Sequence, residues 1–109
     1  MKKLLPLLVA VLAIPAISAR AADAKALYAK DCAKCHGEDG KGETKMGKKL
    51  GAKDYTDAKV QAELKDDAAF KAIKEGLKDK DGKVLMKPQE GASDQDIKDL
   101  VAYMRTFKK

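Results

Sequence analysis

Tryptophan is absent from this sequence, and the other aromatic residues are scarce: three tyrosines and two phenylalanines in 109 residues. Charged residues make up 37% of the chain. A domain of this size buries a modest fraction of its surface, and one so poor in large apolar side chains usually needs a covalent link or a prosthetic group to complete its core. The composition therefore predicts one small domain that requires an added group at its centre.

Cysteine and histidine are also rare, with two cysteines and one histidine in the whole chain. Two cysteines exclude a framework of several disulfides. No stretch alternates apolar and polar residues, and β-branched residues are sparse, so we expect no strands. The net charge is +6, but the basic residues form no dense block interleaved with aromatics. We therefore expect no nucleic-acid partner.

The first residues have the three-part layout of a secretory signal peptide. Lys2 and Lys3 precede an uncharged apolar stretch, and Ala19 and Ala21 then occupy the two sensitive positions of a small-x-small cleavage sequence. We expect residues 1–21 to be removed on export, which leaves residues 22–109 as the domain and places it in the periplasm. The alternative is a retained anchor, but the apolar stretch is shorter than the roughly 20 residues of a comfortable membrane span.

Apolar periodicity and helix-start signals predict helices separated by two glycine-bearing loops, over residues 37–51 and 78–92. Helices are expected over 23–34, after a cap at Thr56, from Asp66 or Asp67 to about Gly76, and from Ser93 to the end of the chain. The inward residues of the three later helices are Val60, Leu64, Phe70, Ile73, Leu77, Ile97, Leu100, Val101, Met104 and Phe107. Asp96 completes a capping box with Ser93. The fold class is therefore all-α.

Both cysteines and the only histidine stand together in Cys32-Ala33-Lys34-Cys35-His36. Thiols at this spacing can add to the two vinyl groups of a porphyrin from one helical turn, and the histidine that follows becomes the proximal ligand of the iron. The motif predicts a covalently attached haem c, with Cys32 and Cys35 as thioether residues and His36 as a metal ligand.

Three other uses of this motif compete with haem attachment. A thioredoxin-like redox pair needs a βαβ context, and none is visible. Structural zinc needs four ligands, whereas cysteine and histidine supply three here. A structural disulfide of an exported protein is the third alternative, and such a protein would be colourless.

The chain resembles class I c-type cytochromes of the small bacterial monohaem kind, over essentially all of residues 22–109. Beside the motif, the resemblance rests on a first helix with Ala24 and Tyr28 and a last helix with Tyr103. It implies a cytochrome c-like fold, in which a few helices wrap around one covalently bound haem. It also implies that the first and last helices cross where the small Ala24 admits Tyr103.

A strong neutral ligand for the sixth iron position has to be a methionine, because His36 is the sole histidine. Met104 belongs to an apolar helical stripe, which is the pattern of a core residue, and Met46 lies close to His36 along the chain. Met86 lies just before the last helix, where the resemblance places the ligand. We expect Met86 to bind the iron, with Met46, or a site that is empty or lysine-ligated, as alternatives. A backbone carbonyl of residues 47–49 is expected to orient His36.

These residues predict an exported one-electron carrier, and not an enzyme, that shuttles electrons between a donor and an acceptor among respiratory or other redox proteins. We expect a monomer whose contact with membrane complexes is at most transient. Lysines near the haem edge would steer an acidic partner; they are Lys34, Lys45, Lys48, Lys49, Lys83 and Lys87. The alternative is a five-coordinate haem protein that binds a gas or turns over peroxide, which a ligand at Met86 disfavours.

Overall fold

The computed structural model describes residues 16–109, and side chains from residue 22 onward. The predicted signal peptide, residues 1–21, lies mostly outside the described residues, so its removal stays a prediction. In the described part of the chain, no helix combines the length and the apolar character needed to cross a membrane.

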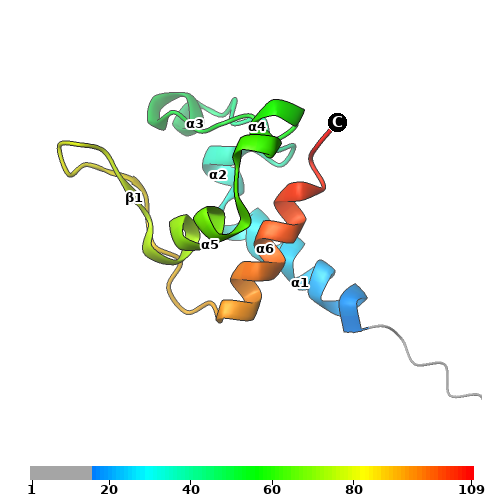
Figure 1. Cartoon of the computed structure of the whole chain (residues 1–109). Helices are drawn as coiled ribbons and strands as arrows, with labels where there is room; N and C mark the ends of the chain where they lie inside the picture. The colour runs from blue at the N-terminus through cyan, green and yellow to red at the C-terminus, as the bar shows by residue number, and fades with distance from the viewer. Residues whose placement is uncertain (1–15) are drawn as a thin grey trace, which may run out of the picture.

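Residues 16–109 form a mainly helical domain, which confirms the expected fold class (Figure 1). The elements follow in the order α1 (Ala16–Asp31), α2 (Ala33–His36), α3 (Lys45–Leu50), α4 (Ala58–Glu63), α5 (Asp66–Glu75), β1 (Leu77–Lys78), β2 (Val84–Met86) and α6 (Asp94–Arg105). Figure 1 shows α6 crossing α1, with α5 beside α6 and the β1–β2 hairpin projecting from the helical body.

The crossing of α1 and α6 forms the centre of the core. Ala24 and Tyr28 of α1 are 3% and 2% exposed, and the α6 residues on the facing side are equally buried. The Tyr28 ring centroid lies 5.2 Å from that of Tyr103 and 5.2 Å from that of Phe107. Tilted aromatic pairs at this distance add to the free energy gained by burial alone. The predicted crossing of the first and last helices is therefore confirmed, with Tyr103 packed against Tyr28.

Helix α5 packs on the opposite side of α6 and extends the core. Ile73 is buried and Phe70 is half-buried against the core cluster, as the helical spacing of these residues predicted. Met104 is a core residue with 8% exposure. The predicted capping box is present, because the Ser93 hydroxyl accepts from Asp96 N at 3.1 Å and the Asp96 carboxylate accepts from Ser93 N at 3.0 Å.

Three sequence expectations about the connections are wrong. The first helix does not continue to residue 34, because α1 ends at Asp31 and the chain turns at Cys32 before α2 begins. The loop over residues 37–51 contains α3, whose N-terminus is capped by the Thr44 side chain. The cap of α4 is Asp57, which accepts from Lys59 N, rather than Thr56.

The expectation of no strands is also wrong, since β1 and β2 form a short antiparallel hairpin. Leu77, predicted to lie inside a helix, pairs with Met86 in this hairpin and is 47% exposed. The turn is held by the Asp79 carboxylate, which accepts from Asp81 N and Lys83 N, both at 2.9 Å. Strands of two and three residues are too short to show alternation, so a side chain that organises the turn determines the pairing.

Candidate functional site

The two cysteines and the histidine lie within one turn of chain at α2. Cys32 occupies the turn between α1 and α2, and its carbonyl accepts from Cys35 N at 3.3 Å and from His36 N at 3.0 Å. Both thiols are free and half-buried. The structure therefore gives no support to a disulfide between them, and it brings Cys32, Cys35 and His36 together on one element.

Side chains from two neighbouring segments hold the end of α2. The Tyr28 hydroxyl, buried in α1, donates to Gly37 O at 2.6 Å. The Thr44 hydroxyl donates to Cys35 O at 2.9 Å and to Lys34 O at 2.7 Å, and it accepts from Gly47 N at 2.9 Å. Sequence reasoning missed Thr44. Its position inside a predicted loop gave no sign that it both caps a helix and contacts the motif.

Gly47 is the second residue that sequence reasoning missed. It lies inside α3 and is buried, and a Cβ atom placed on it would lie 2.1 Å from Cys35 O and 2.5 Å from Gly42 O. No side chain fits there, so the absence of a Cβ allows α3 to lie directly against the backbone of α2. The only signal in the sequence was the glycine itself, which we assigned to a loop.

The imidazole of His36 is half-buried, and its ring centroid lies 5.3 Å from that of Tyr55 at an interplanar angle of 37°. Its Nδ1 atom is buried and has no hydrogen-bond partner among the described residues, so no carbonyl of residues 47–49 orients it. Burial lowers the pKa of His36, because it disfavours the charged form. The neutral imidazole, which can ligate a metal, is therefore favoured.

The Cys32 thiol is also shielded from water. Burial raises its pKa to about 11, with smaller contributions from Asp31 and Cys35. A thiol in this setting stays protonated near neutral pH, unlike the low-pKa thiolates of catalytic disulfide exchange. The site therefore lacks the electrostatics of a thioredoxin-like centre.

The three candidate methionines lie in different places. Met86 lies in β2, half-buried and packed against the core cluster. The chain approaches it closely from α5, since a Cβ on Gly76 would lie 2.5 Å from Met86 O. Met46 is half-buried on α3, the helix that packs against α2. Met104 belongs to the core, as predicted.

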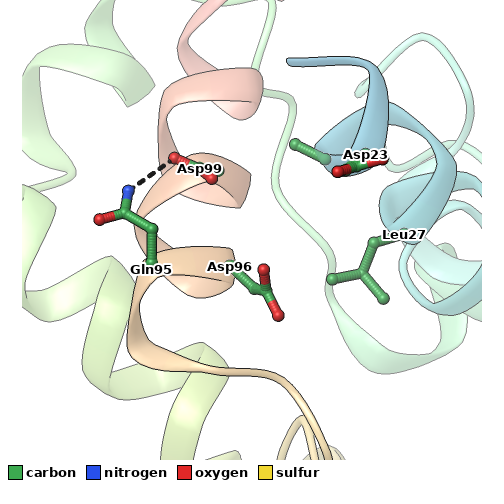
Figure 2. Close-up of a pocket in the computed structure, with 6 residues that line it drawn as sticks. Asp23, Leu27, Gln95, Asp96 and Asp99 are labelled. Atoms are coloured by element: carbon green, nitrogen blue, oxygen red, sulfur yellow. Dashed lines mark hydrogen bonds between the residues drawn. The ribbon is translucent and has the colours of Figure 1, made fainter. Parts of the chain in front are cut away.

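A groove between the middle of α1 and the first two turns of α6 is lined mainly by acidic side chains. Figure 2 shows Asp23 and Leu27 of α1 facing Asp96 and Asp99 of α6 across it, and Asp99 accepts a hydrogen bond of 2.9 Å from Gln95. Within the described residues, no three His, Cys, Asp or Glu side chains are grouped so that they could hold a metal ion. The turn at α2 therefore remains the candidate functional site.

Comparison with known proteins identifies the family. Residues 21–108 match the family model for cytochrome c. The chain belongs to the cytochrome c family. Among solved structures, it is similar to the c-type cytochrome KustC0563, with 36% identity over 79% of this chain and 98% of that chain and a TM-score of 0.68. A point mutant of the same protein matches with 34% identity over 79% and 99% of the two chains and a TM-score of 0.66. No curated protein sequence matches significantly.

The cytochrome c family is one of haem-based electron carriers, and the residues at α2 fit a haem c. The thiols are free, they lie on one turn, and the neighbouring imidazole has a lowered pKa that favours its neutral form and a buried, unpaired Nδ1 atom. A buried ring nitrogen without a partner is costly, and such atoms are typical of functional positions.

Replacing Gly47 with alanine tests the contact between α2 and α3. Intrinsic helix propensity favours alanine over glycine inside a helix by up to about 1 kcal/mol. The Cβ would instead overlap Cys35 O, so we expect Gly47→Ala to destabilise the protein, as measured by denaturant unfolding. Lys48→Ala, on the exposed face of the same helix, is the control and should change stability by less than about 0.5 kcal/mol. A stabilised Gly47→Ala variant would show that the two helices can move apart freely.

Proposed function

We propose that this protein is an exported one-electron carrier that uses one haem c. In this proposal, Cys32 and Cys35 hold the porphyrin through two thioethers, and His36 and Met86 supply the axial ligands. When bound, the haem iron takes up and releases a single electron. The observation that carries the proposal is the placement of both free thiols and the neutral His36 on one turn of a cytochrome c fold.

Two features support Met86 over Met46 as the sixth ligand. Met46 is carried by α3, which packs against α2, and α2 carries His36. A ligand for the opposite face has to come from a segment away from α2. Met86 lies in β2, beyond α5, and its backbone is held near the end of α5, where Gln89 N donates to Ile73 O at 2.8 Å.

The residues around the site would favour the reduced state of a bound haem. A thioether sulfur is a soft, neutral ligand that stabilises Fe(II) relative to Fe(III). A surround that excludes water disfavours the more highly charged oxidised centre, and Tyr55, which is 9% exposed, covers one side of His36. Both effects raise the reduction potential, as suits a carrier rather than an oxygen-activating centre.

The second candidate is a five-coordinate haem protein that binds a gas or peroxide. It would need a distal base or a free arginine near the iron, but the chain has one histidine. Arg105, the sole arginine of residues 22–109, is engaged with Gln61, Leu64 and Asp66. These observations favour electron transfer.

The six lysines predicted near the haem edge are all exposed in the structure. They lie on α2, on α3 and at the β1–β2 hairpin, and the proposed axial ligands come from α2 and β2. A basic surface at these elements would attract an acidic redox partner and orient it toward the haem. We propose such proteins as donor and acceptor, with the periplasm as the compartment.

Removal of both thiols tests the haem attachment. The wild-type protein should keep its haem after denaturation and show the absorption change of a low-spin haem on reduction. Cys32→Ala with Cys35→Ala should lose the attached haem, show little helix by circular dichroism, and melt without a cooperative transition, because the small core needs the porphyrin. A colourless wild-type protein, or a native-like melt of the double variant, would contradict this.

Met86→Ala and Met46→Ala are a matched pair that tests the sixth ligand. Met86→Ala should leave the haem attached, lower the reduction potential, and let carbon monoxide bind the reduced iron, because the sixth position is then open. Met46→Ala should bind no carbon monoxide and keep the wild-type potential. The opposite pattern would assign the sixth position to Met46.

Salt tests the lysine surface. At about 0.15 M ionic strength the Debye length is roughly 8 Å, so attraction between complementary surfaces weakens. The rate of electron transfer to an acidic redox protein should fall as salt is added, and Lys48→Gln with Lys49→Gln should reduce both the rate and its dependence on salt. Lys25→Gln, an exposed lysine of α1, is the control. A rate that stays constant in salt would contradict a steering role.

A further inference from the structure

Gln61 is an unusual member of the core. It lies in α4 and is 5% exposed, and it is the one buried polar side chain found within residues 22–109. The buried residues around it are apolar. A buried amide is costly unless its donors and its acceptor are all paired, so its presence calls for a specific set of partners.

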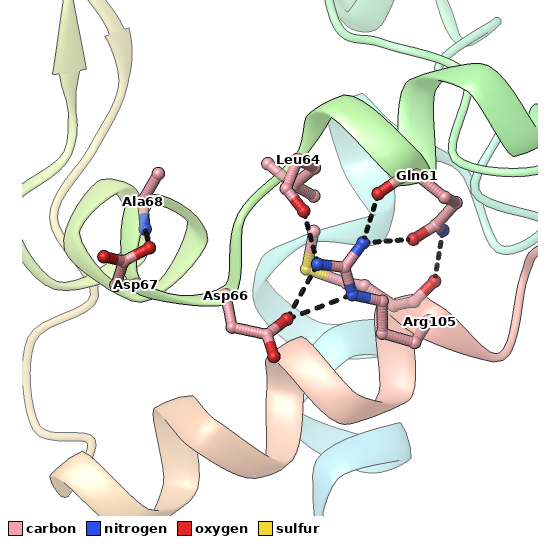
Figure 3. A network of polar contacts seen from close by, with 7 residues as sticks. Gln61, Leu64, Asp66, Asp67, Ala68 and Arg105 are labelled. Carbon is pink, nitrogen blue, oxygen red and sulfur yellow. Dashed lines mark hydrogen bonds and ion pairs between the residues drawn. The ribbon is translucent and has the colours of Figure 1, made fainter.

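The Gln61 amide uses every hydrogen-bonding group it has. Its Nε2 donates to Tyr55 O at 2.6 Å and to Met104 O at 3.0 Å, and its Oε1 accepts from Arg105 Nη1 at 2.8 Å. Figure 3 shows the amide between the α4 backbone and the end of α6. One side chain therefore joins the segment before α4 to the last turn of α6.

Arg105 holds Gln61 in this orientation. Its Nη1 also donates to Gln61 O at 2.7 Å, and its Nη2 donates to Leu64 O and, at 2.7 Å, to the Asp66 carboxylate (Figure 3). The guanidinium thus contacts both the backbone and the amide oxygen of Gln61. Because that oxygen is occupied by an N–H donor, the amide nitrogen is directed at Tyr55 O and Met104 O.

Tyr55 connects this network to the haem ligand. It lies between α3 and α4 in a stretch without helix or strand, so its backbone is held by two contacts: Tyr55 N donates to Gly40 O at 2.8 Å, and Tyr55 O accepts from Gln61. Its ring packs on the imidazole of His36. Without Gln61, one of the two contacts that fix this backbone would be absent.

We propose that Gln61 is a positioning residue for the haem site, which holds Tyr55 against His36 and so keeps water from the proximal ligand. This inference rests on the proposed function, because it concerns the potential of a haem ligated by His36. Water near the ligand raises the local dielectric and stabilises the oxidised iron. Loosening Tyr55 should therefore lower the reduction potential.

The main test compares Gln61→Met with wild type in the haem-bound protein. Methionine has a similar length and fills the space, but it cannot donate to Tyr55 O. We expect the reduction potential to be lower than that of the wild type. We also expect the ratio of the amide hydrogen exchange rate at Tyr55 to that at Ile97 to be higher than in the wild type; Ile97 is buried in α6 away from this network. Arg105→Lys keeps the charge but removes the guanidinium that contacts Gln61 and Asp66 together. It should lower the potential by less than Gln61→Met does.

Two further variants separate positioning from general stability. Asp66→Ala removes the exposed end of the network and leaves Gln61 bound to Tyr55, so the potential should stay unchanged. Tyr55→Leu should lower the potential by itself, and adding Gln61→Met to it should cause no further shift, because the two changes act through one contact.

A purely structural role for Gln61 predicts a different result. Gln61→Met would then lower the melting temperature but leave both the potential and the exchange ratio unchanged, or its effect on the potential would add to that of Tyr55→Leu; either result would overturn the proposal. Haem content and the absorption spectrum are measured first. A chain without haem would contradict the proposed function, and exchange at Tyr55 would still report whether Gln61 holds it.

Discussion

The short turn that carries Cys32, Cys35 and His36 has to be held rigidly, and most of the structure around it serves that constraint. Four residues of helix cannot be stable alone, because helix formation needs several turns to offset its nucleation cost. Here the turn is held by the Tyr28 hydroxyl on one side and by Thr44 and Gly47 on the other. The positions of the thiols and the imidazole are therefore set by their neighbours in space.

Two connections between the small core and the α2 turn explain how that core supports a functional site. The crossing of α1 and α6 supplies the apolar contacts, and the aromatic cluster around Tyr28 joins this crossing to the α2 turn. A second connection is polar and passes through Gln61 to Tyr55. Because a paired buried amide has few alternative arrangements, such a network specifies geometry more strongly than apolar packing does. The last helix is thus linked to the end of α2 through Tyr28 and to His36 through Tyr55.

The errors in the sequence reading share one physical cause. Helix α3 contains a glycine and is short, and the β1–β2 hairpin is shorter still, so neither shows a period. Their stability comes from single side chains: Thr44 caps the helix, and the Asp79 carboxylate closes the hairpin turn. Leu77 was misassigned for the same reason, because its spacing continues the stripe of α5 past the point at which Gly76 ends the helix.

The sequence by itself determined the motif at Cys32 to His36, the longer helices and the capping box at Ser93, because these depend on neighbours within one or two turns. It also pointed to the family, through residues that stand close together along the chain. Only the tertiary structure decided that Gly47 contacts Cys35, that Tyr55 covers His36 and that Gln61 holds Tyr55. Those contacts join segments on different elements, and no local preference of either segment specifies how closely they approach each other.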